Sequence, residues 1–339
     1  MLRPLLIPVL TLIATLAPSV AQERPAKELF GGAALPAALP SEPLGFYSRG
    51  CLAGGVQLPP DGSNWQAMRL SRNRQWGLPI LVDFIVKLAR DAAAQDGWPG
   101  LLVGDLAQPR GGPMLTGHAS HQSGLDADIW LTPMPARRLS EQEREEMSAV
   151  AVVEPGPHEV HRNIWTPAHG RLIRRAALDP RVERIFVAPG IKKELCATAG
   201  SDRSWLSKVR PYYGHNYHFH VRLSCPPGAA CRKQSPPPPG DGCGAPLDWW
   251  YTAEPYRPAP LSDKPPREIM LAELPAQCRK VLLAEPVGGA VTMRQAFNAA
   301  LGLAVAPPAD ALMPFVAEEQ AAAVGETPAR LPRPRPAGR

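Results

Sequence analysis

Residues 218–223 of the 339-residue chain are HFHVRL, a stretch in which polar and apolar side chains alternate. This period of two predicts a β-strand, because successive side chains of a strand point to opposite faces. His218 and His220 therefore share one face, and the three apolar side chains enter a core on the other. Two neighbouring imidazoles on a polar face indicate a shared partner, and zinc suits imidazole nitrogen.

A second histidine group lies upstream in residues 117–128, GHASHQSGLDAD. It begins as a Gly- and Ser-rich loop, and alternation over residues 125–131 predicts a strand with Asp128 on its polar face. His121, Asp128 and His220 would supply three zinc ligands, and a catalytic zinc site keeps its fourth position for water. His218 would then act as a general base or stabilise the oxyanion.

Two other interpretations of these histidines stay open. Same-face histidines also occur on solvated strands that bind no metal, and a closed structural zinc site would use both His218 and His220 as ligands. The sequence contains no GxSxG nucleophile elbow, no HExxH motif and no P-loop. Serine-hydrolase, HExxH-type zinc and nucleotide chemistry therefore lack support.

The elements around these two groups predict the fold class. Residues 76–97 predict an amphipathic helix, with Leu81, Ile85, Leu88 and Ala92 on one face. Further strands are predicted at residues 101–105 and 184–187, and helices are predicted to begin at Ser140 and Thr166. Strands and helices do not alternate as regular βαβ units. This predicts an α+β fold with a central antiparallel sheet, flanking helices and long loops.

Composition shifts divide the chain into four parts. Residues 1–21 have a basic start, a short apolar run and a small-residue cleavage pattern, which predicts a signal peptide rather than a membrane span. Residues 22–44 are rich in Pro and Ala and are predicted to be a leader. The ordered domain is predicted over 45–285, beginning near Gly45. Residues 286–339 predict an Ala- and Pro-rich, mostly disordered tail, with one short helix around 293–305.

The cysteine count agrees with export. The chain has six cysteines, at Cys51, Cys196, Cys225, Cys231, Cys243 and Cys278. An even number in an oxidising compartment predicts three disulfides, although 15 pairings are open, and the loop from Cys225 to Cys231 is the easiest to close. The net charge of +6 indicates an anionic cell-wall polymer or membrane surface rather than nucleic acid, with little weight because much of it lies in the tail.

The motifs resemble those of the penicillin-insensitive murein endopeptidases, relatives of lysostaphin-type enzymes and of D-Ala-D-Ala carboxypeptidases that use zinc. The resemblance covers roughly residues 45–280 and rests on the stretches GCLAG (50–54), GHASHQSGLD (117–126), RIFV (184–187), KVRP (208–211), HFHVRLSCP (218–226) and GDGCG (240–244).

The resemblance implies zinc held by His121, Asp128 and His220, with His218 and His215 at the catalytic centre. It implies hydrolysis of the D-alanyl–diaminopimelate cross-link in murein (peptidoglycan) without an active-site serine, hence insensitivity to penicillin. It also implies the disulfides Cys51–Cys278, Cys196–Cys243 and Cys225–Cys231.

A second metal site is the point where the sequence departs from the family. His118 matches a family position tied to a weaker second metal, but the family's Asp-x-x-His pattern is replaced by EPGPH at residues 154–158. His158 is then either a second-site ligand or an exposed loop histidine.

We therefore expect a periplasmic zinc endopeptidase that acts on murein and has no membrane span once its signal is removed. Two alternatives share these residues: a murein-binding protein with an inert site, and a carboxypeptidase that removes a terminal D-Ala. The sequence leaves open the oligomeric state, the cross-link preference, the number of metals and the role of the tail.

Overall fold

A computed structural model describes residues 24–258 and 267–287 of the chain. The expected signal peptide, the short helix around residues 293–305 and the tail beyond residue 287 lie outside this part and stay predictions. None of the helices in the described ranges is long and apolar enough to cross a membrane.

Two strands that carry the histidine and aspartate motifs form the centre of the main sheet. The β8 strand (Asp126–Trp130) and the β11 strand (His218–Leu223) pair antiparallel. Their register places His220 opposite Asp128 and Arg222 opposite Asp126. Residues more than 90 positions apart in sequence therefore become direct neighbours on one face of the sheet.

The sheet contains seven strands in the order β10-β9-β11-β8-β7-β5-β4. Its other members are β4 (Asp61–Gly62), β5 (Trp65–Ala67), β7 (Leu101–Val103), β9 (Val182–Val187) and β10 (Val209–Pro211). The pairs around β8 and β11 are antiparallel, whereas β9 with β10 and β5 with β7 are parallel. The α+β class is confirmed, and its sheet is antiparallel at the centre and mixed towards the edges.

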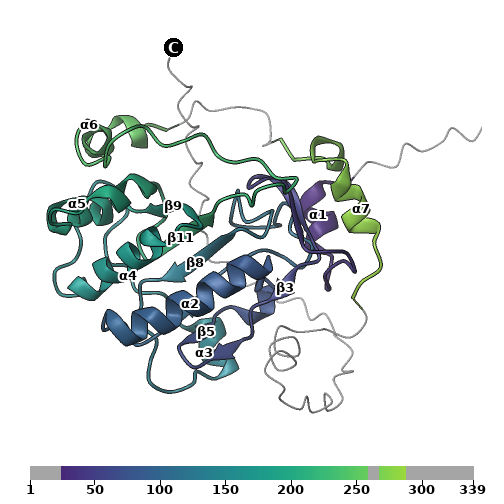
Figure 1. Cartoon of the computed structure of the whole chain (residues 1–339), viewed down its shortest axis with the longest axis horizontal. Helices are drawn as coiled ribbons and strands as arrows, with labels where there is room; N and C mark the ends of the chain where they lie inside the picture. The colour runs from purple at the N-terminus through teal and green to yellow at the C-terminus, as the bar shows by residue number, and fades with distance from the viewer. Residues whose placement is uncertain (1–23, 259–266, 288–339) are drawn as a thin grey trace, which may run out of the picture.

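Helices α2 (Pro79–Gln95) and α4 (Pro167–Leu178) pack side by side against this sheet (Figure 1). The apolar positions predicted for α2, Leu81, Ile85 and Leu88 among them, are buried in the same core as the apolar side chains of β8 and β11. Both helices begin with a proline in the first turn, where its missing N–H costs no hydrogen bond. The helices thus cover one face of the central strands and leave the other face for the polar residues.

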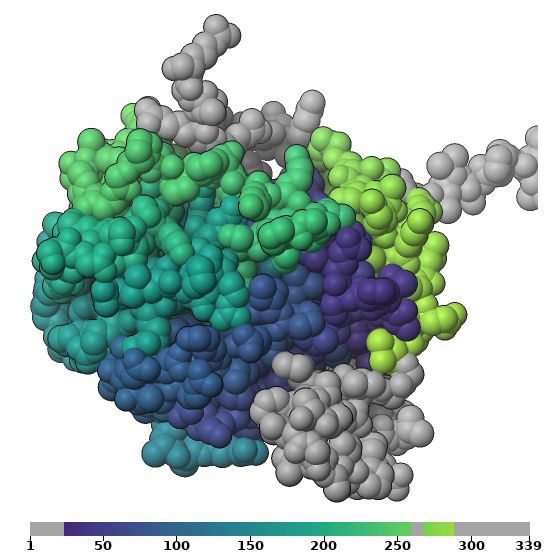
Figure 2. Space-filling view, in the orientation of Figure 1, coloured from purple at the N-terminus to yellow at the C-terminus, as the bar shows by residue number. Residues whose placement is uncertain are grey.

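A second, smaller core joins the two ends of the described chain. Helix α1 (Ala26–Gly31) and the hairpin of β1 (Glu42–Phe46) and β2 (Arg49–Ala53) meet α7 (Gln277–Leu283) there. In Figure 2, the purple N-terminal and lime C-terminal segments form one continuous surface.

The predicted start of the ordered domain near Gly45 is wrong. Helix α1 and most of β1 precede that residue, and the Phe30 ring is fully buried in the second core with Val281. Burying an aromatic ring stabilises a fold by several kcal/mol, so residues within the expected leader are part of the folded unit. Their Pro- and Ala-rich composition did not predict the short helix α1.

The remaining elements are short. They are β3 (Val56–Gln57), β6 (Trp76–Gly77), α3 (Glu141–Glu146), α5 (Pro189–Thr198), α6 (Ala245–Asp248), and the 3-10 turns η1 (Leu70–Arg72), η2 (Ser204–Lys208), η3 (Trp249–Tyr251), η4 (Glu254–Tyr256) and η5 (Leu271–Glu273). The helix starts predicted at Ser140 and Thr166 are confirmed, and both residues form capping boxes.

Three disulfides join the cysteines in the pattern that the resemblance implied: Cys51–Cys278, Cys196–Cys243 and Cys225–Cys231. The first connects β2 to α7, 227 positions apart, and closes the second core covalently. The last closes a loop between residues only six positions apart, just after β11.

Candidate active site

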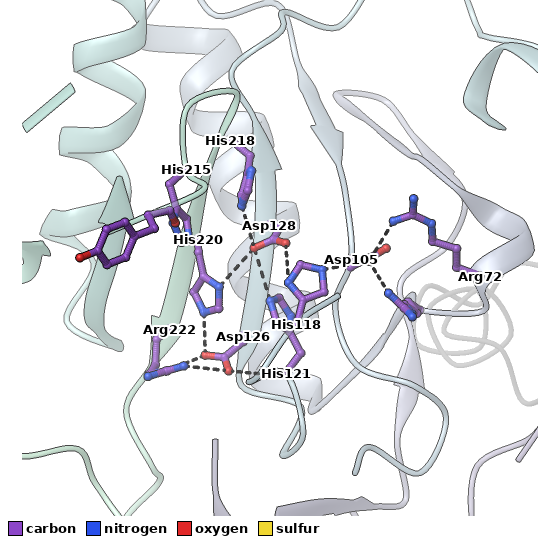
Figure 3. Close-up of polar contacts among 12 residues, drawn as sticks. Arg72, Asp105, His118, His121, Asp126, Asp128, His215, His218, His220 and Arg222 are labelled. Atoms are coloured by element: carbon purple, nitrogen blue, oxygen red, sulfur yellow. Dashed lines mark hydrogen bonds and ion pairs between the residues drawn. The ribbon is translucent and has the colours of Figure 1, made fainter. Parts of the chain in front are cut away.

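The polar face of β8 and β11 carries a dense group of imidazoles and carboxylates (Figure 3). Asp128 stands at its centre. Its Oδ1 atom lies 3.4 Å from His121 Nε2 and 3.2 Å from His220 Nδ1. Asp128 therefore lies next to both predicted histidine ligands, although His121 comes from a loop and the other two from neighbouring strands. Over the described residues, the candidate ligand atoms that all lie within 4.8 Å of one another belong to His118, His121 and Asp128, and His220 is not in that set.

This set of donors fits a metal ion. In the part of the chain described, both ring nitrogens of His121 and the Oδ1 atom of Asp128 are buried without a hydrogen-bond partner. A buried polar atom without a partner costs about 1–3 kcal/mol, so a group of them at one point calls for a ligand that satisfies them together. Two imidazoles and a carboxylate match the donor set of a catalytic zinc site.

The backbone at His121 is in a conformation that non-glycine residues rarely adopt. Its φ angle is 63°, and its N–H donates to Asp126 Oδ2 at 2.9 Å. Such left-handed residues cluster where a structure must aim a side chain. The hydrogen bond to Asp126 thus holds the loop so that the His121 ring faces Asp128.

His118 lies in the same group. Its Nδ1 atom is 3.5 Å from Asp128 Oδ2, and its Nε2 atom is 3.1 Å from Asp105 Oδ2. Candidate ligand atoms of His118, His121 and Asp128 all lie within 4.8 Å of one another. His158 is exposed and lies outside this group, so a second metal shared by His118 and His158 stays a prediction.

His218 and His215 lie beside the three predicted ligands. His218 Nε2 is 3.7 Å from Asp128 Oδ1, and the rings of His215 and His218 have centroids 4.8 Å apart. The Nδ1 atom of His215 is 2.5 Å from the carbonyl oxygen of Tyr213, which can only accept, so this nitrogen donates. Burial lowers the pKa of His218 to about 4 and the pKa of His215 well below its usual value, so both are neutral imidazoles near pH 7.

The two carboxylates of β8 are held ionised. Burial opposes the charge on Asp128, but His121, His218 and His118 outweigh it and keep its pKa well below the usual range. Burial likewise opposes the charge on Asp126, and Arg222, His220 and His121 lower its pKa in the same way. A carboxylate that stays ionised is a better metal ligand than a protonated one.

Sequence reasoning missed the residues that support the ligands. Asp126 Oδ1 accepts a hydrogen bond from Arg222 Nε at 2.7 Å. The same oxygen lies 3.1 Å from His220 Nε2, on the side of the imidazole ring that faces away from Asp128. Partners of this kind orient metal-binding histidines. The signal was present, because Asp126 and Arg222 lie two positions from a predicted ligand on the same strand face.

Asp105, which follows β7, is a further supporting residue that carried no earlier signal. It pairs with His118, Arg74 and Arg72. Burial opposes its charge, but the hydrogen bond with His118 and the charges of Arg74 and Arg72 lower its pKa to about 2. These partners come from segments distant from Asp105 in sequence, so its pairing with His118 could not be predicted from the sequence.

A cavity of about 440 Å³ opens beside the group. Asp128, His118 and His218 line it together with Tyr217 and Arg72. Two imidazoles and a carboxylate beside an open cavity, with further neutral imidazoles in reach, are typical of metal-dependent hydrolases.

Comparison with known proteins shows to which family of hydrolases the chain belongs. The family model described as penicillin-insensitive murein endopeptidase matches residues 43–283, and the chain belongs to this family. A relative of that name from Haemophilus influenzae is 47% identical over 233 residues, covering 67% of this chain and 80% of the relative. Relatives of the same name from Yersinia enterocolitica and Klebsiella pneumoniae are 42% and 43% identical, covering 73% and 71% of this chain and 87% and 86% of their own lengths.

Proposed function

We propose that this protein is a zinc-dependent endopeptidase that hydrolyses the D-alanyl–diaminopimelate cross-links of murein. Family membership supports the reaction class. The observation that supports the metal assignment is that Asp128 Oδ1 lies beside ring nitrogens of both His121 and His220, among buried donor atoms that have no hydrogen-bond partner.

His121 Nε2, Asp128 Oδ1 and His220 Nδ1 are the atoms that would hold the ion. Zinc held there would supply Lewis acidity, the chemistry needed to polarise the scissile carbonyl and to activate a water molecule near neutral pH. Asp126 keeps His220 and the His121 backbone in place for this role. Side chains held by such contacts keep the geometry that the reaction needs.

His218 and His215 are the candidates for proton transfer. Both are neutral near pH 7, so each has a ring nitrogen that can accept a proton. His215 is fixed by Tyr213 through Nδ1, which leaves its Nε2 atom available, and His218 lines the cavity directly. We assign His218 the direct proton transfer and His215 the stabilisation of charge on its neighbour.

The periplasm is the compartment that fits this function. The substrate lies in the cell wall, the three disulfides require an oxidising environment, and residues 1–21 carry a predicted signal peptide.

Ligand substitutions test the proposal. Purified His121→Ala, Asp128→Ala and His220→Ala should each lose bound zinc and fall to background cleavage of cross-linked muropeptide dimers, because two protein ligands hold the ion poorly. His161→Ala is the matched control, since this histidine is partly exposed and pairs with Glu154. It should retain zinc and activity.

Metal analysis and chromatography of the products give the readouts. Normal dimer cleavage by a variant without zinc would contradict the metal assignment. Release of terminal D-Ala from monomers, with dimers left intact, would identify a carboxypeptidase. Retention on murein sacculi without turnover would identify a binding protein.

A further inference from the structure

The cavity beside the metal-binding group has a cationic wall. Arg72, at the end of η1, lines it together with Asp128, His118, His218 and Tyr217. In Figure 3, Arg72 lies across Asp105 from the histidine cluster. A guanidinium beside a reaction centre is a candidate for binding a negatively charged part of the substrate.

The two other arginines near this wall have their donors occupied. Arg69 also lines the cavity, but its guanidinium donates to the backbone carbonyls of Arg144, Glu145 and Met147. Arginine donors that are satisfied by backbone carbonyls stabilise the local fold and are not free for a ligand.

Arg74 is buried and equally occupied. It donates to Asp105 Oδ2 at 2.9 Å and to Thr116 at 3.0 and 3.2 Å. Arg72 differs from both: its side chain is 48% exposed, and its one ion-pair partner within the described residues is Asp105, at 3.2 Å. A guanidinium has five N–H donors, so most of those on Arg72 remain available.

Arg72 is presented on a rigid turn. The residues flanking η1, Arg69 and Asn73, are both left-handed, with φ angles of 55° and 51°. Glu145 accepts from both the backbone N–H and the hydroxyl of Ser71 at 2.8 Å. A side chain on a fixed backbone loses less entropy when it binds a ligand, which favours recognition.

The position of Arg72 relative to the reaction centre is set by a chain of contacts. Arg72 contacts Asp105, Asp105 contacts His118, and His118 contacts Asp128. Asp105 is already shared with Arg74 and His118, so it neutralises only part of the charge on Arg72. Arg72 therefore keeps part of its positive charge, and Asp105 and His118 separate it from Asp128 of the proposed ligand set.

We propose that Arg72 binds the free carboxylate of the diaminopimelate residue whose amino nitrogen is released in the reaction. This inference rests on the proposed function, because the carbon bonded to the scissile nitrogen of that cross-link also carries a carboxylate. The carboxylate lies next to the reacting carbonyl, and a guanidinium can bind it with two parallel hydrogen bonds. Arg72 is then a specificity-determining residue that selects and orients the cross-link.

Two matched muropeptide dimers test the inference. One carries the free carboxylate beside the scissile nitrogen, and the other carries an amide at that position. The wild-type protein should cleave the acid with a kcat/KM roughly 10- to 100-fold above that of the amide, because the amide lacks the charge that strengthens the hydrogen bonds. Arg72→Ala should cleave the two dimers about equally, with the loss on the acid appearing mainly in KM.

Two controls separate recognition from structure. Arg90→Ala removes an exposed arginine from α2 and should keep the wild-type preference. Arg72→Lys should recover part of the preference, since it restores the charge without the two-pronged geometry. Bound zinc should be unchanged in every variant, because Asp105 retains Arg74 and His118.

Three results would overturn the inference. If the wild-type protein cleaves the acid dimer and the amide dimer equally well, the protein does not recognise the carboxylate. An Arg72→Ala variant that loses activity on both dimers by the same factor shows that Arg72 only supports Asp105. Failure of the wild type to cleave either dimer, with zinc bound, would refute the proposed function itself and the inference with it.

Discussion

At the scale of single residues, Asp126 connects the fold to the candidate metal centre. This fully buried carboxylate contacts the His121 backbone, the His220 ring and the Arg222 guanidinium. Each contact fixes a different part of the site, and Arg222 stabilises the buried charge. The aspartate thus positions two of the proposed ligands without being one of them.

Substitution of Asp126 by asparagine should therefore weaken metal binding. We expect zinc affinity and dimer cleavage to fall by roughly 10- to 100-fold, the usual effect of removing a partner of a metal-binding histidine. Competition with a chelator measures the affinity. Asp179→Asn, at a half-buried carboxylate beyond α4 that pairs with Arg181, is the matched control and should leave affinity unchanged. Equal zinc affinity in wild type and Asp126→Asn would show that Asp126 does not position the proposed ligands.

At the scale of elements, the register of β8 and β11 decides which side chains meet. A shift of one residue would turn His220 and Asp128 to opposite faces, so the alternation of apolar residues protects the site as well as the core. The disulfides act at the same scale. The Cys51–Cys278 bond connects β2 with α7, and the Cys225–Cys231 bond closes a short loop after β11.

Removal of these two disulfides should have unequal effects on stability. The loop-closure entropy predicts a loss in unfolding free energy of about 5 kcal/mol for the Cys51→Ala/Cys278→Ala pair and about 2 kcal/mol for Cys225→Ala/Cys231→Ala. Denaturant unfolding measures both under the same conditions. Equal losses, or a larger loss from the short loop, would mean that native contacts rather than chain entropy dominate.

At the scale of the whole molecule, Lys192 connects three segments within the fold. This lysine of α5 is fully buried and donates to the carbonyl oxygens of Leu206 and Asp241 at 2.8 and 2.6 Å. Burial, and to a smaller extent Arg210, lower the pKa of Lys192 to about 7, against partial compensation by Asp241. Its usual pKa in an unfolded chain is about 10.4.

The unfolding free energy should therefore depend on pH through Lys192. Between pH 7 and about 10 the unfolded chain binds a proton that the folded chain has lost, so the contribution of Lys192 to stability rises with pH and is lost again as pH falls to about 7. In this window the unfolding free energy of the wild type should rise relative to that of Lys192→Met by up to about 1.4 kcal/mol per pH unit. Denaturant unfolding from pH 6 to 9.5 measures it, and parallel profiles would contradict a depressed pKa.

The local patterns that predicted the elements held because they depend on short-range geometry. The apolar face of α2, the capping residue Ser140 and the alternation in β8 and β11 each act within a few residues. The prediction that residues 22–44 form a leader was wrong for the opposite reason, because the burial of these residues depends on distant segments. Phe30 is buried in a core that includes Cys278 and Val281 of α7, some 250 positions later, and nothing in the neighbouring sequence signals those partners.

The sequence by itself determined that Asp128 and His220 stand on the polar faces of two strands and that His121 lies in the loop before the first of them, and hence the three proposed ligands. The tertiary structure alone decided that these residues meet, that Asp126 and Arg222 support them, and that Arg72 faces the same cavity. The physical reason is that strand periodicity is a local property of the chain, whereas pairing register and the approach of distant loops follow from burying one shared core.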